Sequence, residues 1–128
     1  MDELKIDYDL DKEDPCNTLI NLLKTVTFFT FLYPAIMYIY TTAHGIHIRI
    51  LLGRPLDRET HLMLRTTFGD DSWRVTRDIV RMKRNYPSWN VLFTWRRKKW
   101  DNTTCAETPL DLKTAIKVLE QLCYEKTR

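Results

Sequence analysis

The strongest constraint on the fold is the alternation of apolar and polar residues near the start of the chain. Residues 4–11 place Leu, Ile, Tyr and Leu in alternate positions and Lys and three Asp between them. A period of two residues is that of a β-strand with one buried face. Asp7 and Asp9 are therefore expected to point to the same, uncovered side of a sheet. Any fold of this chain has to accommodate two adjacent carboxylates there.

The rest of the chain predicts a small α+β fold. Asp14 and Pro15 form a helix start, with an acceptor at the cap and proline in the first turn. We expect helices over residues 15–32, 55–68 and 111–124, and strands over residues 4–10, 35–42, 46–51, 73–79 and 90–95. The order β-α-β-β-α-β-β-α predicts an RRM-like sheet with helices on one face and the other face open.

Length and composition favour one domain without a membrane span. The 128 residues suffice for a single core, so residues 1–128 are taken as one domain. Residues 19–40 are apolar enough to suggest a span, but Lys24 and Pro34 interrupt them and favour a buried helix followed by a strand. Cys16, Cys105 and Cys123 form no CxxC pair, which argues against a zinc site or a disulfide framework and for a reducing, cytoplasmic location.

The candidate site collects on the predicted open face. His47 alternates with isoleucines, so we expect it beside Asp7 and Asp9, and Arg49 follows two residues later on the same side. Asp78 has a strand phase that brings a third carboxylate to this face. Three carboxylates can hold two divalent ions, Mg²⁺ or Mn²⁺, which activate a 3′-hydroxyl and stabilise a pyrophosphate leaving group. An imidazole there can donate to a phosphate or act as acid or base.

Basic and aromatic residues after the acidic site suit a nucleic-acid partner. The net charge is only +3, but the first fourteen residues are acidic and the middle of the chain is basic. The candidates for neutralising phosphates come in the segments after Asp7 and Asp9: Arg77, Arg81, Arg84, Arg96, Arg97, Lys98 and Lys99. Three tryptophans interleave with them and are candidates either for stacking on bases or for the core: Trp89, Trp95 and Trp100.

The order of these features resembles the catalytic core of archaeo-eukaryotic primases and primase-polymerases. The first motif is a strand ending in DxD, here Asp7-Tyr8-Asp9. The second is a small-residue turn that leads into a strand with histidine, here residues 41–49. The third is an apolar strand with an acid followed by basic residues, here residues 74–81. The resemblance covers roughly residues 4–97.

The resemblance implies a role for each matched residue. Asp7, Asp9 and Asp78 would hold metal, with Asp71 as an alternative third acid, and His47 would contact the phosphates of the incoming nucleotide. The remaining phosphate-binding candidates are Thr41, Thr42, His44, Arg49 and Arg81. The implied activity is transfer from nucleoside triphosphates to a nucleic-acid 3′-hydroxyl in replication or repair, by the chain alone or with a partner subunit.

Two other functions stay open on the sequence. A sheet with an open face can bind single-stranded nucleic acid without catalysis, although Asp7 and Asp9 would repel phosphate unless a metal ion intervenes. A rolling-circle replication endonuclease is also built on a small open sheet. It usually needs two histidines one residue apart and a nucleophilic tyrosine, whereas His44 and His47 are three apart.

Overall fold

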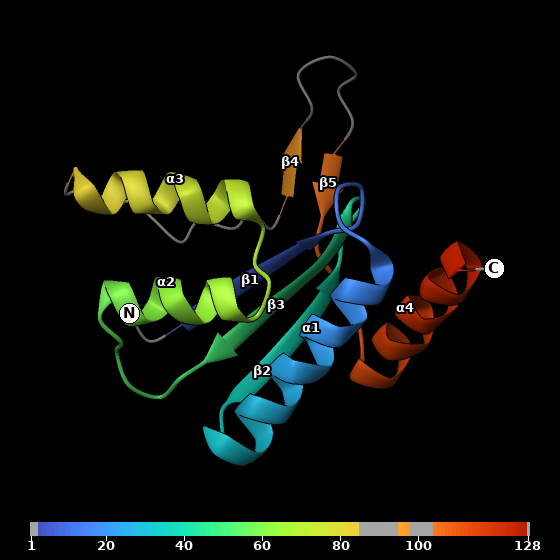
Figure 1. The fold of residues 1–128 in the computed structure, drawn as a ribbon, viewed down its shortest axis with the longest axis horizontal. Coiled ribbons are helices and arrows are strands. Elements are labelled where there is room, and N and C mark those ends of the chain that lie inside the picture. The colour runs from blue at the N-terminus through green and yellow to red at the C-terminus, as the bar shows by residue number, and fades with distance from the viewer. Residues whose placement is uncertain (1–2, 85–94, 98–103, 128) are drawn as a thin grey trace.

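The structure, a computed structural model, describes residues 3–84, 95–97 and 104–127, and its fold is α+β (Figure 1). The predicted strand over residues 90–95 falls mostly outside them. The elements in chain order are β1 (Glu3–Asp9), α1 (Pro15–Thr27), the π-helix η1 (Phe28–Leu32), β2 (Ile36–Thr41), β3 (Gly45–Leu51), α2 (Arg58–Thr67), α3 (Ser72–Lys83), β4 (Trp95–Arg97), β5 (Thr104–Ala106), β6 (Thr108–Pro109) and α4 (Leu112–Thr127).

The main sheet is antiparallel, with the strand order β1-β3-β2-β6, and β4 and β5 form a separate pair. The predicted hairpin of β2 and β3 is confirmed, with Ile39 opposite Ile48. The register of β1 on β3 sets Asp7 opposite His47 and Lys5 opposite Arg49. An open antiparallel sheet therefore carries the predicted polar positions side by side on neighbouring strands.

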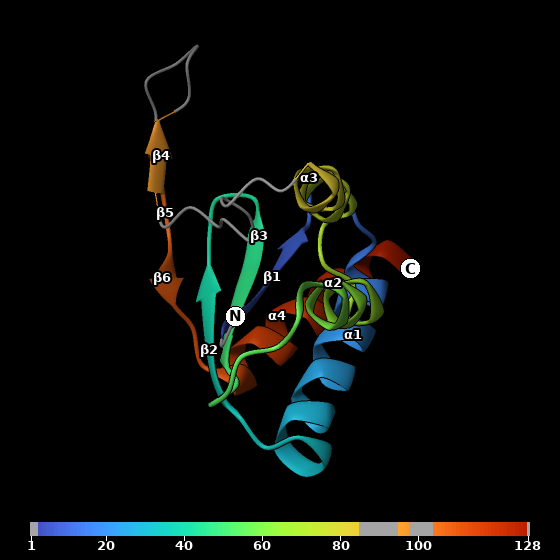
Figure 2. The same ribbon diagram turned by 90° about the vertical axis from the view of Figure 1, so that its left-hand side faces the viewer.

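The apolar face of the sheet packs on α1 and α4. The alternate residues Leu4, Ile6 and Tyr8 of β1 are fully buried, as predicted. They meet Leu22 of α1 and Leu119 of α4 in one core. Figure 2 shows these helices on one side of the sheet, with β6 beside β2 at its edge. Because burial falls on every second residue of β1, its acidic positions are left on the opposite face.

The outer edge of β1 is covered by side chains and by the α2–α3 turn. His61 Nε2 donates to the carbonyl of Glu3 at 2.9 Å, and Arg74 Nη1 donates to the carbonyl of Lys5 at 2.8 Å. Farther along, the main-chain N–H of Asp7 donates to a carboxylate oxygen of Asp70 at 2.7 Å. An exposed strand edge would leave such groups unpaired, so these contacts take the place of a further strand.

The predicted strand over residues 73–79 is wrong, because these residues belong to α3. The buried stripe of α3 consists of Arg74, Val75 and Asp78, at helical spacing. Two of the three are charged, so a search for apolar periodicity does not detect the stripe. Val75 packs on Leu62 of α2 in a small second cluster. The helix was not predicted because two of its buried residues are charged.

The helix start at Asp14 is confirmed, whereas the prediction against a disulfide is wrong. The Asp14 carboxylate accepts from the N–H of Cys16 at 2.9 Å and caps α1. Cys16 and Cys123 form a disulfide bond that joins the first turn of α1 to the last turns of α4 across 107 residues. Lys126 adds an ion pair with Asp14 at 3.5 Å at the same place.

No helix in the described part of the chain is both long enough and apolar enough to span a membrane. The apolar stretch that raised the question divides into α1 with η1 and then β2, as predicted. Phe29 of η1 is buried and contacts Phe28 and Phe68.

Gly69 follows the end of α2 with a φ of 82°, in the left-handed region that glycine adopts without strain.

Candidate functional site

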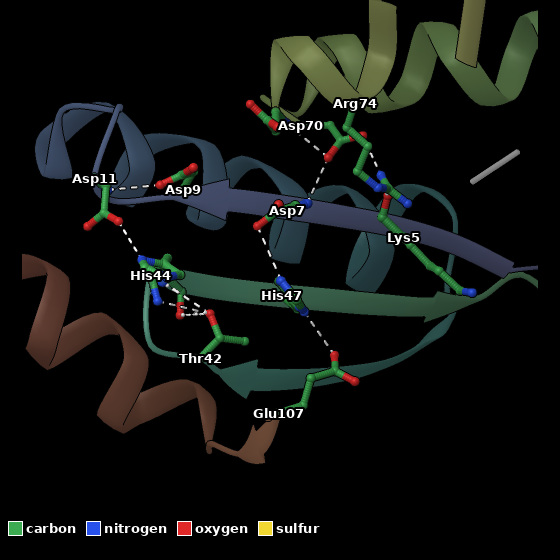
Figure 3. Close-up of polar contacts among 12 residues, drawn as sticks. Lys5, Asp7, Asp9, Asp11, Thr42, His44, His47, Asp70, Arg74 and Glu107 are labelled. Carbon is green, nitrogen blue, oxygen red and sulfur yellow. Dashed lines mark hydrogen bonds and ion pairs between the residues drawn. The ribbon is translucent and has the colours of Figure 1, made fainter. Parts of the chain in front are cut away.

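Asp7 and His47 face each other across the strands β1 and β3 (Figure 3). The imidazole Nε2 of His47 lies 3.3 Å from Oδ1 of Asp7. The Asp7 side chain keeps 23% of its surface exposed and that of His47 keeps 11%. The residues predicted to meet on the face opposite the isoleucines are thus in contact, although the histidine is more buried than an open surface implies.

Asp9 and Asp11 lie at the end of β1 and in the loop that follows. A carboxylate oxygen of Asp9 accepts from the N–H of Asp11 at 3.0 Å, and Lys12 pairs with Asp9 at 3.6 Å. The Asp11 carboxylate contacts Nδ1 of His44 at 2.5 Å. Asp9 therefore stays beside Asp7 on the strand, while His44 is held by the loop.

The turn between β2 and β3 is organised by Thr42. Its hydroxyl accepts from the N–H of Gly45 at 3.1 Å and from the N–H of His44 at 3.4 Å. A Cβ on Gly45 would collide with the carbonyl oxygen of Tyr8, so only glycine lets the two strands approach this closely. Thr42 is used in shaping the turn, whereas Thr41 ends β2 opposite Ile46.

Glu107, which the sequence did not single out, is the second carboxylate on His47. Its Oε2 lies 3.0 Å from Nδ1 of His47, and Arg49 donates to its Oε1 from Nη2 at 2.8 Å. Burial acts to lower the pKa of Arg49, but Glu107 and Glu3 more than offset it and raise that pKa. Glu107 is a lone acid between two short strands, and no local pattern marks such a residue.

Two further acids lie near Asp7 and Asp9. The N–H of Asp71 donates to the carbonyl of Asp7 at 2.9 Å. Burial raises the pKa of Glu13 to about 7; the Thr18 hydroxyl opposes this rise, and the charges of Asp71, Asp7 and Asp9 add to it. Asp7, Asp9, Glu13 and Asp71, termed the acidic cluster below, thus interact electrostatically.

Asp78 does not lie on the sheet face, and its expected position there is wrong. Its side chain is fully buried on α3 and pairs with Arg65 Nη1 at 2.7 Å. Arg81, one turn further along α3, lies 3.8 Å from the same carboxylate. Of the two acids considered for the third motif, Asp71 is the one whose main chain contacts Asp7.

The carboxylates at this face could ligate a metal ion, but the described side chains do not form a complete set of metal ligands. Among residues 3–84 and the later described segments, no three His, Cys, Asp or Glu side chains converge as metal ligands. Mg²⁺ in nucleotide enzymes is usually held by one or two carboxylates together with water and substrate phosphates. Asp7 and Asp9, adjacent on one strand face and partly exposed, fit that mode.

The two histidines hold different carboxylates. His44 contacts Asp11 in the loop, and His47 lies between Asp7 and Glu107. The two imidazoles therefore contact no common carboxylate in the described segments, which speaks against the shared two-histidine site of a rolling-circle endonuclease. Trp89 and Trp100, candidates for stacking on bases or for the core, lie outside the described residues.

Comparison with protein-family models, with curated proteins and with solved structures gave no match for this chain.

Proposed function

We propose that the chain is a metal-dependent nucleotidyltransferase of the primase-polymerase type. The observation that carries the proposal is the contact of Asp7 with His47 across β1 and β3, with Asp9 next to them on the same face. Carboxylates and an imidazole on an open sheet face suit a divalent ion, Mg²⁺ or Mn²⁺, together with a triphosphate. The substrates would be nucleoside triphosphates and the 3′-hydroxyl of a nucleic-acid strand.

Asp7 and Asp9 would hold the ion, and Asp71 is the better candidate than Asp78 for a third acid. Asp78 is neutralised by Arg65 inside the protein, and moving its carboxylate to the sheet face would leave that arginine buried without its partner. The N–H of Asp71 already contacts the main chain of Asp7, and its charge acts on Glu13 together with the charges of Asp7 and Asp9. The proposed function therefore takes Asp71 rather than Asp78 as its third acid.

The residues of the chain would bind and orient the reactants. When bound, a divalent ion lowers the pKa of the attacking hydroxyl and neutralises charge on the leaving pyrophosphate. His44, at 34% side-chain exposure on the turn, would approach the phosphates from the end of the sheet. Arg49 lies farther down β3 and is clamped by Glu107, so it would add positive charge rather than move to the substrate.

Incorporation of a labelled nucleotide into a primed or unprimed single-stranded template tests the proposal. With Mn²⁺ present, the wild type is expected to extend the strand. Asp7→Asn and Asp9→Asn should reduce incorporation by about 100-fold or more, since each removes several kcal/mol of metal-based stabilisation. Glu120→Gln, an exposed carboxylate change on α4, is the matched control and should keep full activity.

A second candidate function is metal-independent binding of single-stranded nucleic acid. The observation in its favour is a row of three side chains across the sheet. Tyr38 of β2, which is half exposed, lies opposite Arg49 of β3, and Arg49 lies opposite Lys5 of β1. An aromatic ring beside two cations on a sheet suits a stacked base and its phosphate. Two results together would favour this function over the transferase. The protein would bind single-stranded nucleic acid in EDTA and bind it more weakly as Tyr38→Ala, and the wild type would incorporate no nucleotide.

A further inference from the structure

A buried carboxylate holds the His47 ring at Nδ1, the nitrogen that does not face Asp7. Glu107 has a side chain only 6% exposed, and its Oε2 takes the hydrogen bond from Nδ1 of His47 at 3.0 Å. Arg49 holds the same carboxylate with Nη2 at 2.8 Å and Nε at 3.3 Å. Glu107 is therefore clamped itself and cannot swing away from the imidazole without breaking two contacts to arginine.

This arrangement directs one ring nitrogen toward Asp7. Nδ1 of His47 faces the carboxylate of Glu107, so Nε2, on the other side of the ring, faces Oδ1 of Asp7 at 3.3 Å. A divalent ion bound between Nε2 and Oδ1 would take the lone pair of Nε2 while Nδ1 donates its hydrogen to Glu107. Metal-binding histidines characteristically donate their other N–H to a carboxylate in this way.

We propose that His47 Nε2 and Asp7 Oδ1 are two ligands of one divalent ion, and that Glu107 is the positioning residue that orients the histidine for it. Neighbouring donors around a six-coordinate ion with bonds of about 2.1 Å lie about 3 Å apart, close to the spacing of these two atoms. The proposal rests on the proposed function in that both place the ion at Asp7. It goes beyond it by making His47 a metal ligand rather than a phosphate contact.

The mixed ligand set indicates which ion is preferred. Imidazole nitrogen binds first-row transition ions better than it binds Mg²⁺, and carboxylates accept both. One nitrogen and one carboxylate oxygen therefore favour Mn²⁺ over Mg²⁺ at this position. The site would discriminate between the two ions through His47, and that discrimination would depend on Glu107.

Mn²⁺ alone, without nucleotide or nucleic acid, is the probe. Titration followed by the electron paramagnetic resonance of free Mn²⁺ gives the affinity, and electron spin-echo modulation reports whether a nitrogen nucleus is bonded to the ion. We expect nitrogen modulation in the wild type and its loss in His47→Asn. Glu107→Ala should weaken Mn²⁺ binding by about 10- to 100-fold, the usual effect of removing a carboxylate that orients a histidine ligand.

Controls separate positioning from folding. Glu107→Gln keeps the shape of the side chain and can still accept from Nδ1, so it should retain part of the affinity and the nitrogen modulation. Glu120→Gln should match the wild type. Wild-type Mn²⁺ binding without nitrogen modulation would overturn the proposal, as would unchanged affinity and modulation in a folded Glu107→Ala protein.

The proposal and the proposed function can fail separately. Nitrogen-coupled Mn²⁺ binding in a protein that never incorporates nucleotides would support the metal site and refute the transferase. Nucleotide incorporation by a protein whose bound Mn²⁺ shows no nitrogen coupling would support the transferase and refute the role of His47 as a ligand.

Discussion

The carboxylate of Asp78 lies 2.7 Å from the guanidinium of Arg65, and neither side chain reaches solvent. Removing one partner leaves the other charge buried, so we expect Asp78→Asn to lower the free energy of unfolding by about 3–5 kcal/mol. Urea denaturation measures the loss. Asp11→Asn, which removes an exposed carboxylate, should cost less than about 1 kcal/mol. Equal effects of the two variants would contradict the buried pair.

The same placement predicts that a change at Asp71 affects metal binding and a change at Asp78 does not. Asp71→Asn removes one charge of the acidic cluster and should weaken Mn²⁺ binding about tenfold, equivalent to about 1.4 kcal/mol. Asp78→Asn should leave the affinity of the folded protein unchanged. Calorimetric titration at a temperature well below both unfolding transitions provides the comparison. A larger loss of affinity in Asp78→Asn than in Asp71→Asn would contradict this choice and support Asp78 as the third acid, as the sequence predicted.

The bond between Cys16 and Cys123 predicts a redox-dependent stability. It closes a loop of 107 residues, and the chain-entropy estimate for such a loop is about 4–5 kcal/mol. Adding a reductant should lower the free energy of unfolding by about that amount. The double variant Cys16→Ala/Cys123→Ala should start lower and show no response, whereas Cys105→Ser should respond like the wild type. Modification of all three cysteines in the unreduced, denatured protein would refute the bond.

His61 predicts a loss of stability in mild acid. It is fully buried, and burial lowers its pKa from 6.5 to about 4. Because the folded pKa is the lower one, the unfolded state binds more protons between these values. The contribution of neutral His61 to the free energy of unfolding is therefore fully present above pH 6.5. It is lost as the pH falls toward 4, by up to about 3 kcal/mol. His61→Gln keeps a donor for the Glu3 carbonyl but does not titrate. The stability advantage of the wild type over this variant should shrink over that range, and a constant difference would contradict the assignment.

Glu13 predicts a pH dependence of the opposite sign. Its folded pKa of about 7 exceeds the ordinary 4.5, so the folded state holds the extra proton and the resulting stability is lost as the pH rises through 7. Glu13→Gln should therefore be the more stable protein at pH 8, and the difference should disappear below about pH 5. The side chain is partly exposed, so we expect less than about 1 kcal/mol after solvent screening. Thermal unfolding of both proteins at pH 8 and pH 5 tests it, and a variant less stable at pH 8 would refute it.

Local sequence was enough to predict the elements that depend on neighbours in the chain. The alternation around Asp7 predicted β1 and its polar face, the Asp14 cap predicted the start of α1, and the turn before Gly45 predicted the hairpin of β2 and β3. These signals lie within a few residues of one another, because a strand alternates at period two and a helix start is fixed by its first turn. From them the contact of Asp7 with His47 followed.

Tertiary structure alone decided which charged groups are buried and what they contact. Arg65, Asp70 and Asp78 form an internal network across α2 and α3, and hydrophobic patterns cannot reveal a helix whose buried stripe is charged. Glu107 reaches His47 from 60 residues away, and Cys16 reaches Cys123 from 107. Such pairings depend on how the helices and strand edges meet in space. Sequence therefore determined the face on which the acids lie, and only packing determined which acids share it.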